Sequence, residues 1–423
     1  MQIQDDRSFA KVLGPGLLFA GAAVGVSHLV QATYAGAVYG LSLLGVIVLA
    51  NVVKYPAFSF GPRFASATGT SLLEGYRRQG RWALVVFSLV TIATMFTVEA
   101  AVVLVTAALF KALFGLELSL FVLSALLIVG SATICAVGKF ATLDVVIKFV
   151  VVVLTIATVV ATALALGRID FSTSLVPSFS LNQKAQLLWL AALIGWMPTA
   201  IDLSVWSSLW TLAKRRQTGY AASVRESLLD FKVGYWGTAM LALCFALLGA
   251  GIVYGSGKPV PAQAVPFANM ILDLYGDTLG GSARTLIGGC AALVMFSTTL
   301  TVVDGFPRAI AVLIERFRGP EEPAADAELE GNPLYWNSVL VIGVGSAIII
   351  KYFRTDLGSL VNIATTISFV TAPVLAYLNH RAITSDLVPS AHRPGKALLT
   401  FSALAIGVMS LFSCAYLYLR FVA

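Results

Sequence analysis

The chain has 423 residues, of which 58% are apolar and only 12% are charged. Soluble domains average about 25% charged residues, so this composition predicts an integral membrane protein and excludes an ordinary soluble domain. The net charge of +7 is expected in cytoplasmic loops, where Lys and Arg set orientation, and does not indicate nucleic-acid binding. The cysteines form no CxxC pair, lie in or beside apolar segments and are expected to be free thiols. They are Cys135, Cys244, Cys290 and Cys414.

Apolar segments long enough to cross a bilayer recur along the whole chain. A membrane-spanning helix needs about 20 mostly apolar residues. By that measure the sequence predicts eleven spans, of which 12–35 and 187–213 are broken in the middle. The other spans are expected at 42–66, 82–113, 118–137, 143–166, 232–254, 283–314, 333–351, 357–379 and 397–419.

Basic residues concentrate in alternate loops, namely those after the second, sixth, eighth and tenth spans. Because such loops are usually cytoplasmic, we expect a cytoplasmic N-terminus and, with an odd number of spans, an external C-terminus in the plasma membrane. The loop 255–282 is expected outside, with a surface helix near 266–279. The acidic segment 319–332 is expected to be a solvated cytoplasmic linker. The sequence does not decide between a monomer and a homo-oligomer.

The two broken segments carry helix-breaking residues at their middle. Val12–Tyr34 is interrupted at Val24–His28, and Leu187–Ala213 is interrupted at Gly195–Pro198. A break within the bilayer leaves backbone groups without intrahelical partners, which is tolerated only inside protein or beside a polar cavity. Two breaks in corresponding positions of two halves indicate a secondary transporter with a substrate site near the membrane midplane.

The positions of the breaks also predict an internal repeat. Each broken span begins a set of five spans, and the two sets start at opposite faces of the membrane. The predicted fold is therefore all-α, with a five-plus-five inverted repeat and an eleventh helix, in one membrane domain covering 1–423. The first repeat is expected at 1–166, the second at 187–379 and the additional helix at 397–419.

Several motifs resemble a known family. The start Gly14-Pro15-Gly16, the pair Met197-Pro198 in a broken sixth span, and the eleven predicted spans resemble the NRAMP divalent-metal transporters. The likeness covers essentially the whole chain. It implies the LeuT-type fold, with broken helices 1 and 6, and a divalent cation of the manganese or magnesium type as substrate.

The chain departs from this family at the residues that bind the metal. The Asp-Pro-Gly-Asn motif of the first NRAMP helix is replaced by Gly25-Val26-Ser27-His28, so Gly25 stands for the metal-binding aspartate. Met-Pro-His in the sixth helix becomes Met197-Pro198-Thr199, and Thr-Asp-x-x-Glu in the third keeps only its glutamate, Glu99. The chain thus resembles a divergent NRAMP-related clade with altered metal and coupling residues.

Three side chains near the breaks are candidates for binding substrate. His28, beside Ser27, can ligate a borderline metal or carry a proton, or it can be a neutral histidine hydrogen-bonded to carbonyls freed by the break. Met197 offers a thioether for softer metals, or it is a packing residue. Asp202 lies within the apolar stretch Ile201–Trp210 and can be a ligand, a proton carrier or one half of a buried ion pair.

Two further ionisable residues lie inside predicted spans. Glu99 in the third span is a candidate proton relay or a structural hydrogen-bonding group. Lys54 lies roughly 18 Å into the second span, at 1.5 Å per residue, and is too deep to reach water easily. We expect it to pair with Asp202 or Glu99. A fixed cation at that depth would also repel a divalent ion.

Three functions stay open at this level. In the first, a divalent cation is bound around Gly25, Ser27, His28, Met197 and Asp202, with Glu99 or Lys54 in coupling. In the second, the half-helix N-termini bind a small organic solute such as an amino acid, and Lys54 replaces a driving cation. In the third, a sensor or receptor has kept the fold and lost transport. No ATP-binding motif or catalytic constellation is found, so neither an enzyme nor a resident cofactor is expected.

Overall fold

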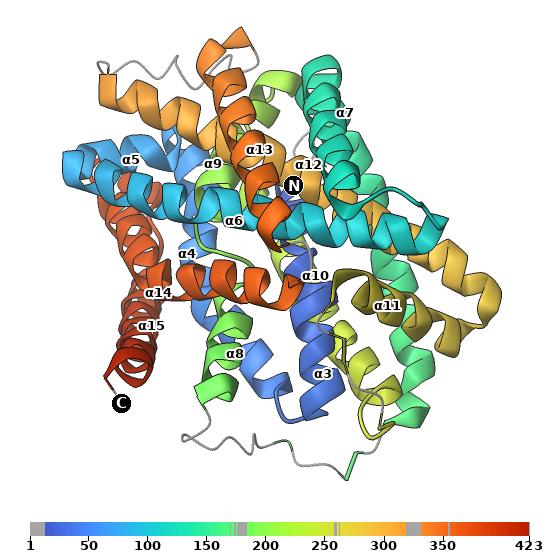
Figure 1. Cartoon of the computed structure of the whole chain (residues 1–423). Helices are drawn as coiled ribbons and strands as arrows, with labels where there is room; N and C mark the ends of the chain where they lie inside the picture. The colour runs from blue at the N-terminus through green and yellow to red at the C-terminus, as the bar shows by residue number, and fades with distance from the viewer. Residues whose placement is uncertain are drawn as a thin grey trace, which may run out of the picture.

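The computed structural model describes residues 13–169, 171–172, 175, 184–257, 260–261, 263–318, 331–353 and 356–422. In this part of the chain every regular element is a helix, as predicted (Figure 1). Ten helical stretches among these described residues are long and apolar enough to cross a membrane. The chain is therefore a multi-pass α-helical membrane protein.

Both predicted breaks are present. The first broken span consists of α2 (Pro15–Ala23), the π-helical turn η1 (Val26–Ala32) and α3 (Thr33–Tyr39), and the second of α8 (Lys184–Gly195) and α9 (Leu203–Thr218). The remaining helices are α4 (Leu44–Thr68), α5 (Leu72–Gln79), α6 (Arg81–Phe114), α7 (Leu120–Ala165), α10 (Val224–Ile252), α11 (Ala264–Leu279), α12 (Gly281–Arg318), α13 (Pro333–Phe353), α14 (Leu357–Thr384) and α15 (Lys396–Phe421), with 3₁₀ turns η2 (Leu166–Arg168) and η5 (Ser390–His392).

The number of long helices differs from the prediction of eleven spans. The predicted sixth span is divided into α8 and α9, of 12 and 16 residues, and neither is long enough to cross alone. The predicted spans 118–137 and 143–166 correspond to two of the ten stretches, Leu120–Val137 and Val151–Arg168, although both belong to the single helix α7 of 46 residues. No proline lies between them to end a helix. At 1.5 Å per residue α7 is about 69 Å long, more than twice the thickness of a bilayer core.

The predicted surface helix near 266–279 exists, but it does not lie free on the surface. In α11, Phe267, Ile271 and Leu272 are at most 4% exposed, because this apolar side of the helix packs against α6 and α12. Of the predicted acidic linker, residues 319–330 lie outside the described residues.

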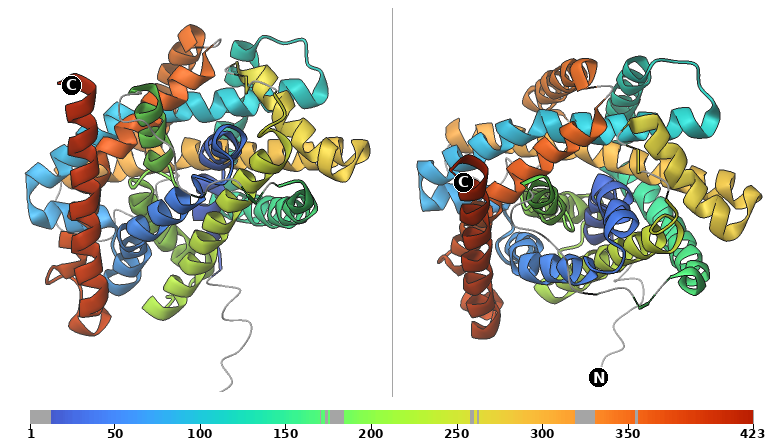
Figure 2. Two further views of the ribbon diagram at one scale, coloured as in Figure 1. Left: turned by 90° about the horizontal axis from the view of Figure 1, so that it is seen from below. Right: turned by 60° about the horizontal axis from the view of Figure 1, so that its bottom comes forward.

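The two broken spans lie in the interior of the bundle. The right view of Figure 2 shows them near the middle, α2 and α3 in dark blue and α8 and α9 in green, with the other helices around them. Within its most apolar window, the first broken span is 83% buried, whereas α15 at the edge of the bundle is 22% buried. The breaks are thus surrounded by protein, which is the condition for interrupting a helix at membrane depth.

Helix α10 packs very closely along the first broken span. A Cβ atom on Gly234 would lie 1.9 Å from the carbonyl oxygen of Gly16, and one on Gly249 would lie 2.3 Å from that of Thr33. Glycines are required at both points because any side chain would meet backbone atoms. The contact covers both α2 and α3, so α10 supports the span on either side of its break.

Asp230 explains the Gly14-Pro15-Gly16 start of the first broken span. Its carboxylate, which comes from α10, accepts hydrogen bonds from the backbone N–H of Gly14 at 3.1 Å and of Gly16 at 2.6 Å. These amides belong to the N-terminal end of α2, where N–H groups have no intrahelical partner and the helix dipole favours a negative charge. Pro15 fits the first helical position because it has no N–H to satisfy.

The basic loops meet at one end of the bundle. Arg316 near the end of α12 forms an ion pair with Glu74 of α5, with 3.2 Å between Nε and Oε2. Arg63 of α4 donates to the carbonyl oxygen of His392, in the loop after α14, at 3.0 Å. Loops after the second, eighth and tenth predicted spans therefore share one end, as the charge pattern requires. That this end faces the cytoplasm stays a prediction.

We predict that Gly234→Ala destabilises the protein by about 1–3 kcal/mol, because the added methyl group would overlap the Gly16 carbonyl. Gly237→Ala is the matched control on the same helix, since nothing lies within 4 Å of its Cβ position. Alanine is also the better helix former, so this control should be neutral or slightly stabilising. Thermal unfolding in detergent measures both variants, and an equal loss of stability in the two would contradict the close packing.

Candidate functional site

The first break is short and is followed by a wide helical turn. Helix α2 ends at Ala23, and Gly25, with φ −134° and ψ −126°, leads into the π-turn η1. The interruption that was predicted over Val24–His28 is confined to Val24 and Gly25, so Ser27 and His28 lie in η1. Both side chains therefore have positions fixed by helical backbone.

Thr298 of α12 occupies the space that a side chain at position 25 would need. A Cβ atom on Gly25 would lie 2.7 Å from Cγ2 and 2.9 Å from Oγ1 of Thr298. The Thr298 hydroxyl donates to the carbonyl of Gly21 at 2.8 Å and also lies 3.3 Å from that of Val24. Gly25 thus serves close packing, and a hydroxyl group approaches carbonyls that the break has freed.

His28 is fully buried and both ring nitrogens have partners. Nε2 lies 2.9 Å from the carbonyl oxygen of Thr238 in α10, and because a carbonyl only accepts, Nε2 carries a proton. Nδ1 lies 2.7 Å from Oγ of Ser27, which is itself 2.6 Å from the carbonyl of Ala23. In this geometry His28 behaves as the hydrogen-bonded histidine and has no nitrogen free for a metal.

At the second break, the carbonyl groups at the end of α8 converge on Lys54. Helix α8 ends at Gly195, and residues 196–202 are not helical before α9 begins. The Lys54 ammonium donates to the carbonyls of Ile194 at 2.6 Å and Gly195 at 2.8 Å, with that of Thr199 at 3.4 Å. These carbonyls lack helical partners, and an ammonium group has three donors to offer.

The predicted ion pair of Lys54 with Asp202 or Glu99 is wrong for the residues that the structure describes, since backbone carbonyls take the ammonium group instead. Lys54 is 1% exposed, and its charge still lies near enough to Asp202 for an electrostatic interaction. Glu99 in α6 is 2% exposed, and neither a hydrogen bond nor an ion pair to it is found among the described residues.

A small cavity of about 30 Å³ lies between the two breaks. Its polar lining comes from Ser27, Thr199, Asp202 and Thr298, and its wall includes the rings of Trp196 and Trp206. A volume of this size holds about two water molecules. The cavity touches both interrupted spans and α12, and is thus the candidate substrate site.

The predicted site residues fall into two groups around this cavity. Ser27 and Asp202 line it, and Asp202 precedes the first residue of α9. His28 and Met197 are fully buried but do not line it. Glu99 does not line it either, although its neighbours Val98 and Val102 on α6 do. The structure therefore brings Asp202 and Ser27 together and leaves the other proposed ligands outside the cavity.

Sequence reasoning missed Thr298. The signal was present, because Ser297-Thr298-Thr299 is a run of hydroxyl residues inside an otherwise apolar predicted span. Trp206 was also missed. It packs edge-on against Phe306 at 4.6 Å between ring centroids, and an aromatic residue in a membrane helix gives no distinctive sequence signal.

Asp304 and Arg308, four residues apart in α12, form an ion pair with contacts of 2.6 and 3.0 Å. The pair also has a wider role, because Asp304 accepts hydrogen bonds from Trp210 of α9 and Tyr335 of α13, each at 3.0 Å. It therefore joins the second broken span to two other helices.

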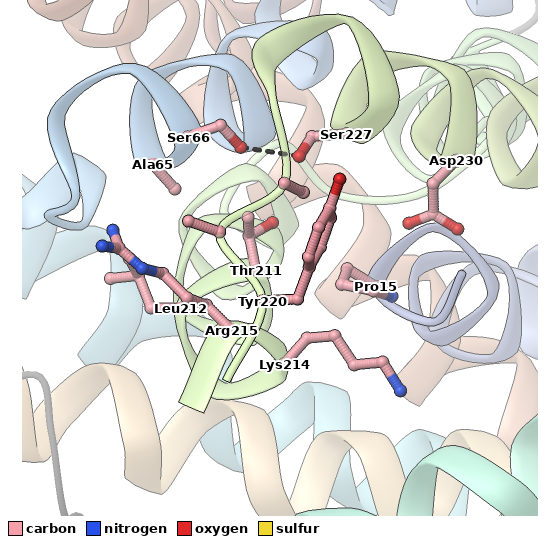
Figure 3. Close-up of a pocket in the computed structure, with 12 residues that line it drawn as sticks. Pro15, Ala65, Ser66, Thr211, Leu212, Lys214, Arg215, Tyr220, Ser227 and Asp230 are labelled. Atoms are coloured by element: carbon pink, nitrogen blue, oxygen red, sulfur yellow. Dashed lines mark hydrogen bonds between the residues drawn. The ribbon is translucent and has the colours of Figure 1, made fainter. Parts of the chain in front are cut away.

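A second small cavity, of about 40 Å³, lies where α2, α4, α9 and α10 meet (Figure 3). Tyr220 and Lys214 lie on one side of it, and Asp230 approaches from α10. Ser66 of α4 donates to Ser227 of α10 at 2.7 Å. Together with the contact of Asp230 at the start of α2, this bond connects α2, α4 and α10.

Solved transporters share this arrangement of helices, which is the LeuT-type fold. The Eremococcus coleocola manganese transporter superposes with a TM-score of 0.72 and 12% identity, over 98% of this chain and 87% of that one. MhsT in complex with L-phenylalanine gives 0.60 at 14% identity, over 99% of each chain. Mhp1, a nucleobase-cation-symport-1 family transporter, gives 0.57 at 14% identity, over 96% of this chain and 91% of that one.

No protein-family model matches the chain. The chain is 36% identical over 412 residues to the uncharacterized protein PM0681 of Pasteurella multocida (strain Pm70), covering 96% of this chain and 91% of that protein. It belongs to the same protein family as PM0681.

We predict that Gly25→Ala costs about 1–3 kcal/mol, because its methyl group would overlap Thr298. Thr298→Ala should cost a similar amount, since it leaves buried carbonyls without a donor. In the double variant the overlap with Cγ2 and Oγ1 is gone, so the combined cost should be at least about 1 kcal/mol less than the sum. A double-mutant cycle of thermal or denaturant unfolding measures this coupling, and strictly additive costs would contradict the contact.

Proposed function

We propose that the chain is a secondary transporter that moves a small organic solute without net charge, such as an amino acid, by alternating access. The cavity between the two helix breaks is the binding site in this proposal. The unit formed by α2–α3, α4, α8–α9 and α10 moves against the remaining helices and exposes the cavity to one side of the membrane at a time. The cavity has a volume of only about 30 Å³, which is too small for an amino acid, so binding requires these helices to separate.

The charge of the site is the observation that carries this proposal. Asp202 is the one carboxylate among the described residues that line the cavity, and the Lys54 ammonium lies nearby at the α8 break. A negative and a positive group together give a region with no net charge, which favours a solute with no net charge. A divalent cation needs an excess of negative ligands, and no group of three His, Cys, Asp or Glu suited to a metal occurs in the part of the chain that the structure describes.

The orientation of the half-helices supports a zwitterionic solute. The cavity touches Val26 and Ser27, which begin η1, and Leu203, which begins α9. The N-terminal end of a helix attracts a carboxylate through its free N–H groups and its dipole. Asp202 at the same cavity would attract an ammonium group. The two ends of an amino acid thus find complementary charges, and Trp196 and Trp206 offer apolar surface to a side chain.

A divalent metal ion of the manganese or magnesium type is the second candidate substrate. The similarity to the Eremococcus coleocola manganese transporter favours it, as does the Met197-Pro198 pair of the NRAMP resemblance. Against it, Thr298 fills the position of the missing aspartate, both nitrogens of His28 are engaged, and Met197 lies outside the cavity.

We predict that proteoliposomes containing the protein accumulate radiolabelled neutral amino acids, tested as a panel that includes L-alanine and L-phenylalanine. Asp202→Asn keeps the shape of the side chain but removes its charge, so uptake should fall at least about tenfold. Asp356→Asn is the matched control. Asp356 caps α14 far from the cavity by accepting from the N–H of Ser359 at 3.0 Å, and asparagine is an equally good cap.

Manganese and magnesium are offered separately to the same proteoliposomes, loaded with a metal-quenched dye. Saturable uptake of either metal that is lost in Asp202→Asn, with no uptake of amino acids, would overturn the organic-solute proposal in favour of the metal. Equal effects of Asp202→Asn and Asp356→Asn on uptake would contradict the assignment of the cavity as the binding site.

A further inference from the structure

Lys54 connects the middle of one helix to the broken end of another. It lies in α4, between residues that continue the helix on both sides, and is 1% exposed. Its ammonium group reaches α8, where it lies 2.6 Å from the carbonyl oxygen of Ile194, 2.8 Å from that of Gly195 and 3.4 Å from that of Thr199. Two of these carbonyls end α8, and the third belongs to the non-helical segment that follows.

Three carbonyl oxygens that converge on one point form a site for a cation. The C-terminal end of a helix carries a partial negative charge, and its last carbonyls have no helical partners. In transporters with broken helices, unwound carbonyls and half-helix C-terminal ends are the groups that coordinate a coupling ion. Here the nitrogen atom of Lys54 lies at that point, so a free cation has neither the oxygen atoms nor the space.

The first break has a comparable arrangement with a neutral group. The Thr298 hydroxyl donates to the carbonyl of Gly21 at 2.8 Å and approaches that of Val24 at 3.3 Å. Carbonyls at both breaks are thus satisfied by side chains from neighbouring helices. This second, independent contact indicates that side chains of the protein itself donate to the backbone carbonyls that the breaks leave without helical partners.

We propose that the Lys54 ammonium is a tethered cation that fills the ion site at the α8 break, so that the protein needs no free sodium or potassium ion at this site. Lys54 is then a positioning residue, which holds the non-helical segment 196–202 and thereby Asp202 at the cavity. The part of this inference that concerns uptake rests on the proposed transport function. The part that concerns ion binding does not, because it can be measured through stability alone.

The first measurement uses the wild-type protein in detergent. Its melting temperature is followed while sodium, potassium or choline chloride is titrated at constant ionic strength. The expected result is the same melting temperature in all three salts, since the site is already filled. A saturable rise in sodium or potassium but not in choline would overturn the proposal, because binding to the folded state alone raises stability in that way.

The second measurement uses Lys54→Ala, which removes the atoms of a propylammonium ion. It leaves the Gly195 carbonyl without its ammonium donor and the Ile194 carbonyl with only the backbone N–H of Met197, at 3.3 Å. We expect its melting temperature to fall by about 5 °C or more. Propylammonium chloride should restore most of the loss in a saturable manner, and sodium should restore part of it. A fall that neither ion reverses would contradict the proposal. If the variant folds only when propylammonium is present during purification, that requirement supports it.

Lys111→Ala is the matched control. Lys111 also donates to backbone carbonyls at a helix end, those of Leu116 at 2.8 Å and Leu118 at 2.7 Å, but in an exposed loop where water can replace it. Its variant should show little loss and no rescue. In Lys54→Met an apolar side chain fills the space of the lysine chain, so propylammonium should not restore the stability of this variant. Equal rescue of the Met and Ala variants would indicate a non-specific effect of the amine.

Uptake separates this inference from the proposed function. If wild-type proteoliposomes take up an amino acid equally in sodium and in choline medium, both hold. If uptake occurs only with sodium, the tethered-cation inference is wrong and the transport proposal stands. If no solute is taken up but the stability results are as expected, transport is wrong and the ion site filled by Lys54 stands.

Discussion

The structure depends on how the protein satisfies backbone carbonyls at two interrupted helices inside a membrane bundle. An unpaired carbonyl in such a place costs several kcal/mol, so a broken helix is stable only if something donates to it. Here Lys54 donates to the end of α8, and Thr298 donates to the end of α2. Each donor comes from a neighbouring helix, so each break is also a point of contact between two helices. The broken spans are therefore positioned by the helices around them, and the cavity between them is a consequence of that positioning.

The same two donors decide which chemistry the site offers. Thr298 occupies the space that an aspartate side chain at position 25 would need. Lys54 places a positive charge at the other break. The Asp202 carboxylate therefore has the positive charge of Lys54 nearby. In the function proposed above, electrostatics in such a region disfavours a dication and permits a solute with no net charge or with separated charges. The LeuT-type fold is compatible with both kinds of substrate, as the solved structures of a manganese transporter and of MhsT with L-phenylalanine illustrate.

Sequence reasoning located the fold and the breaks because their causes are local. Gly25 and the Met197-Pro198 pair are residues that favour interruption of a helix in an apolar span, and the structure confirms both interruptions. The partner of Lys54 could not be predicted, since it depends on where α8 ends relative to α4. A carboxylate partner was expected because buried charges usually pair. Backbone carbonyls freed by a break can also accept from the ammonium group, but their positions follow only from the three-dimensional structure. The two spans predicted at 118–137 and 143–166 are found as the stretches Leu120–Val137 and Val151–Arg168, but their union in one helix, α7, was not predicted. The repeat boundaries at 166, 187 and 379 stay a prediction.

The central claim is that the cavity between the breaks opens alternately to the two sides of the membrane. The most direct test places a single cysteine at Ala200, which lines that cavity, in a background without Cys135, Cys244, Cys290 and Cys414. A membrane-impermeant maleimide is applied from the outside or the inside of proteoliposomes. The account predicts labelling from both sides, with a rate that changes when a transported solute is added. Labelling from one side only, whatever solute is present, would contradict alternating access at this cavity.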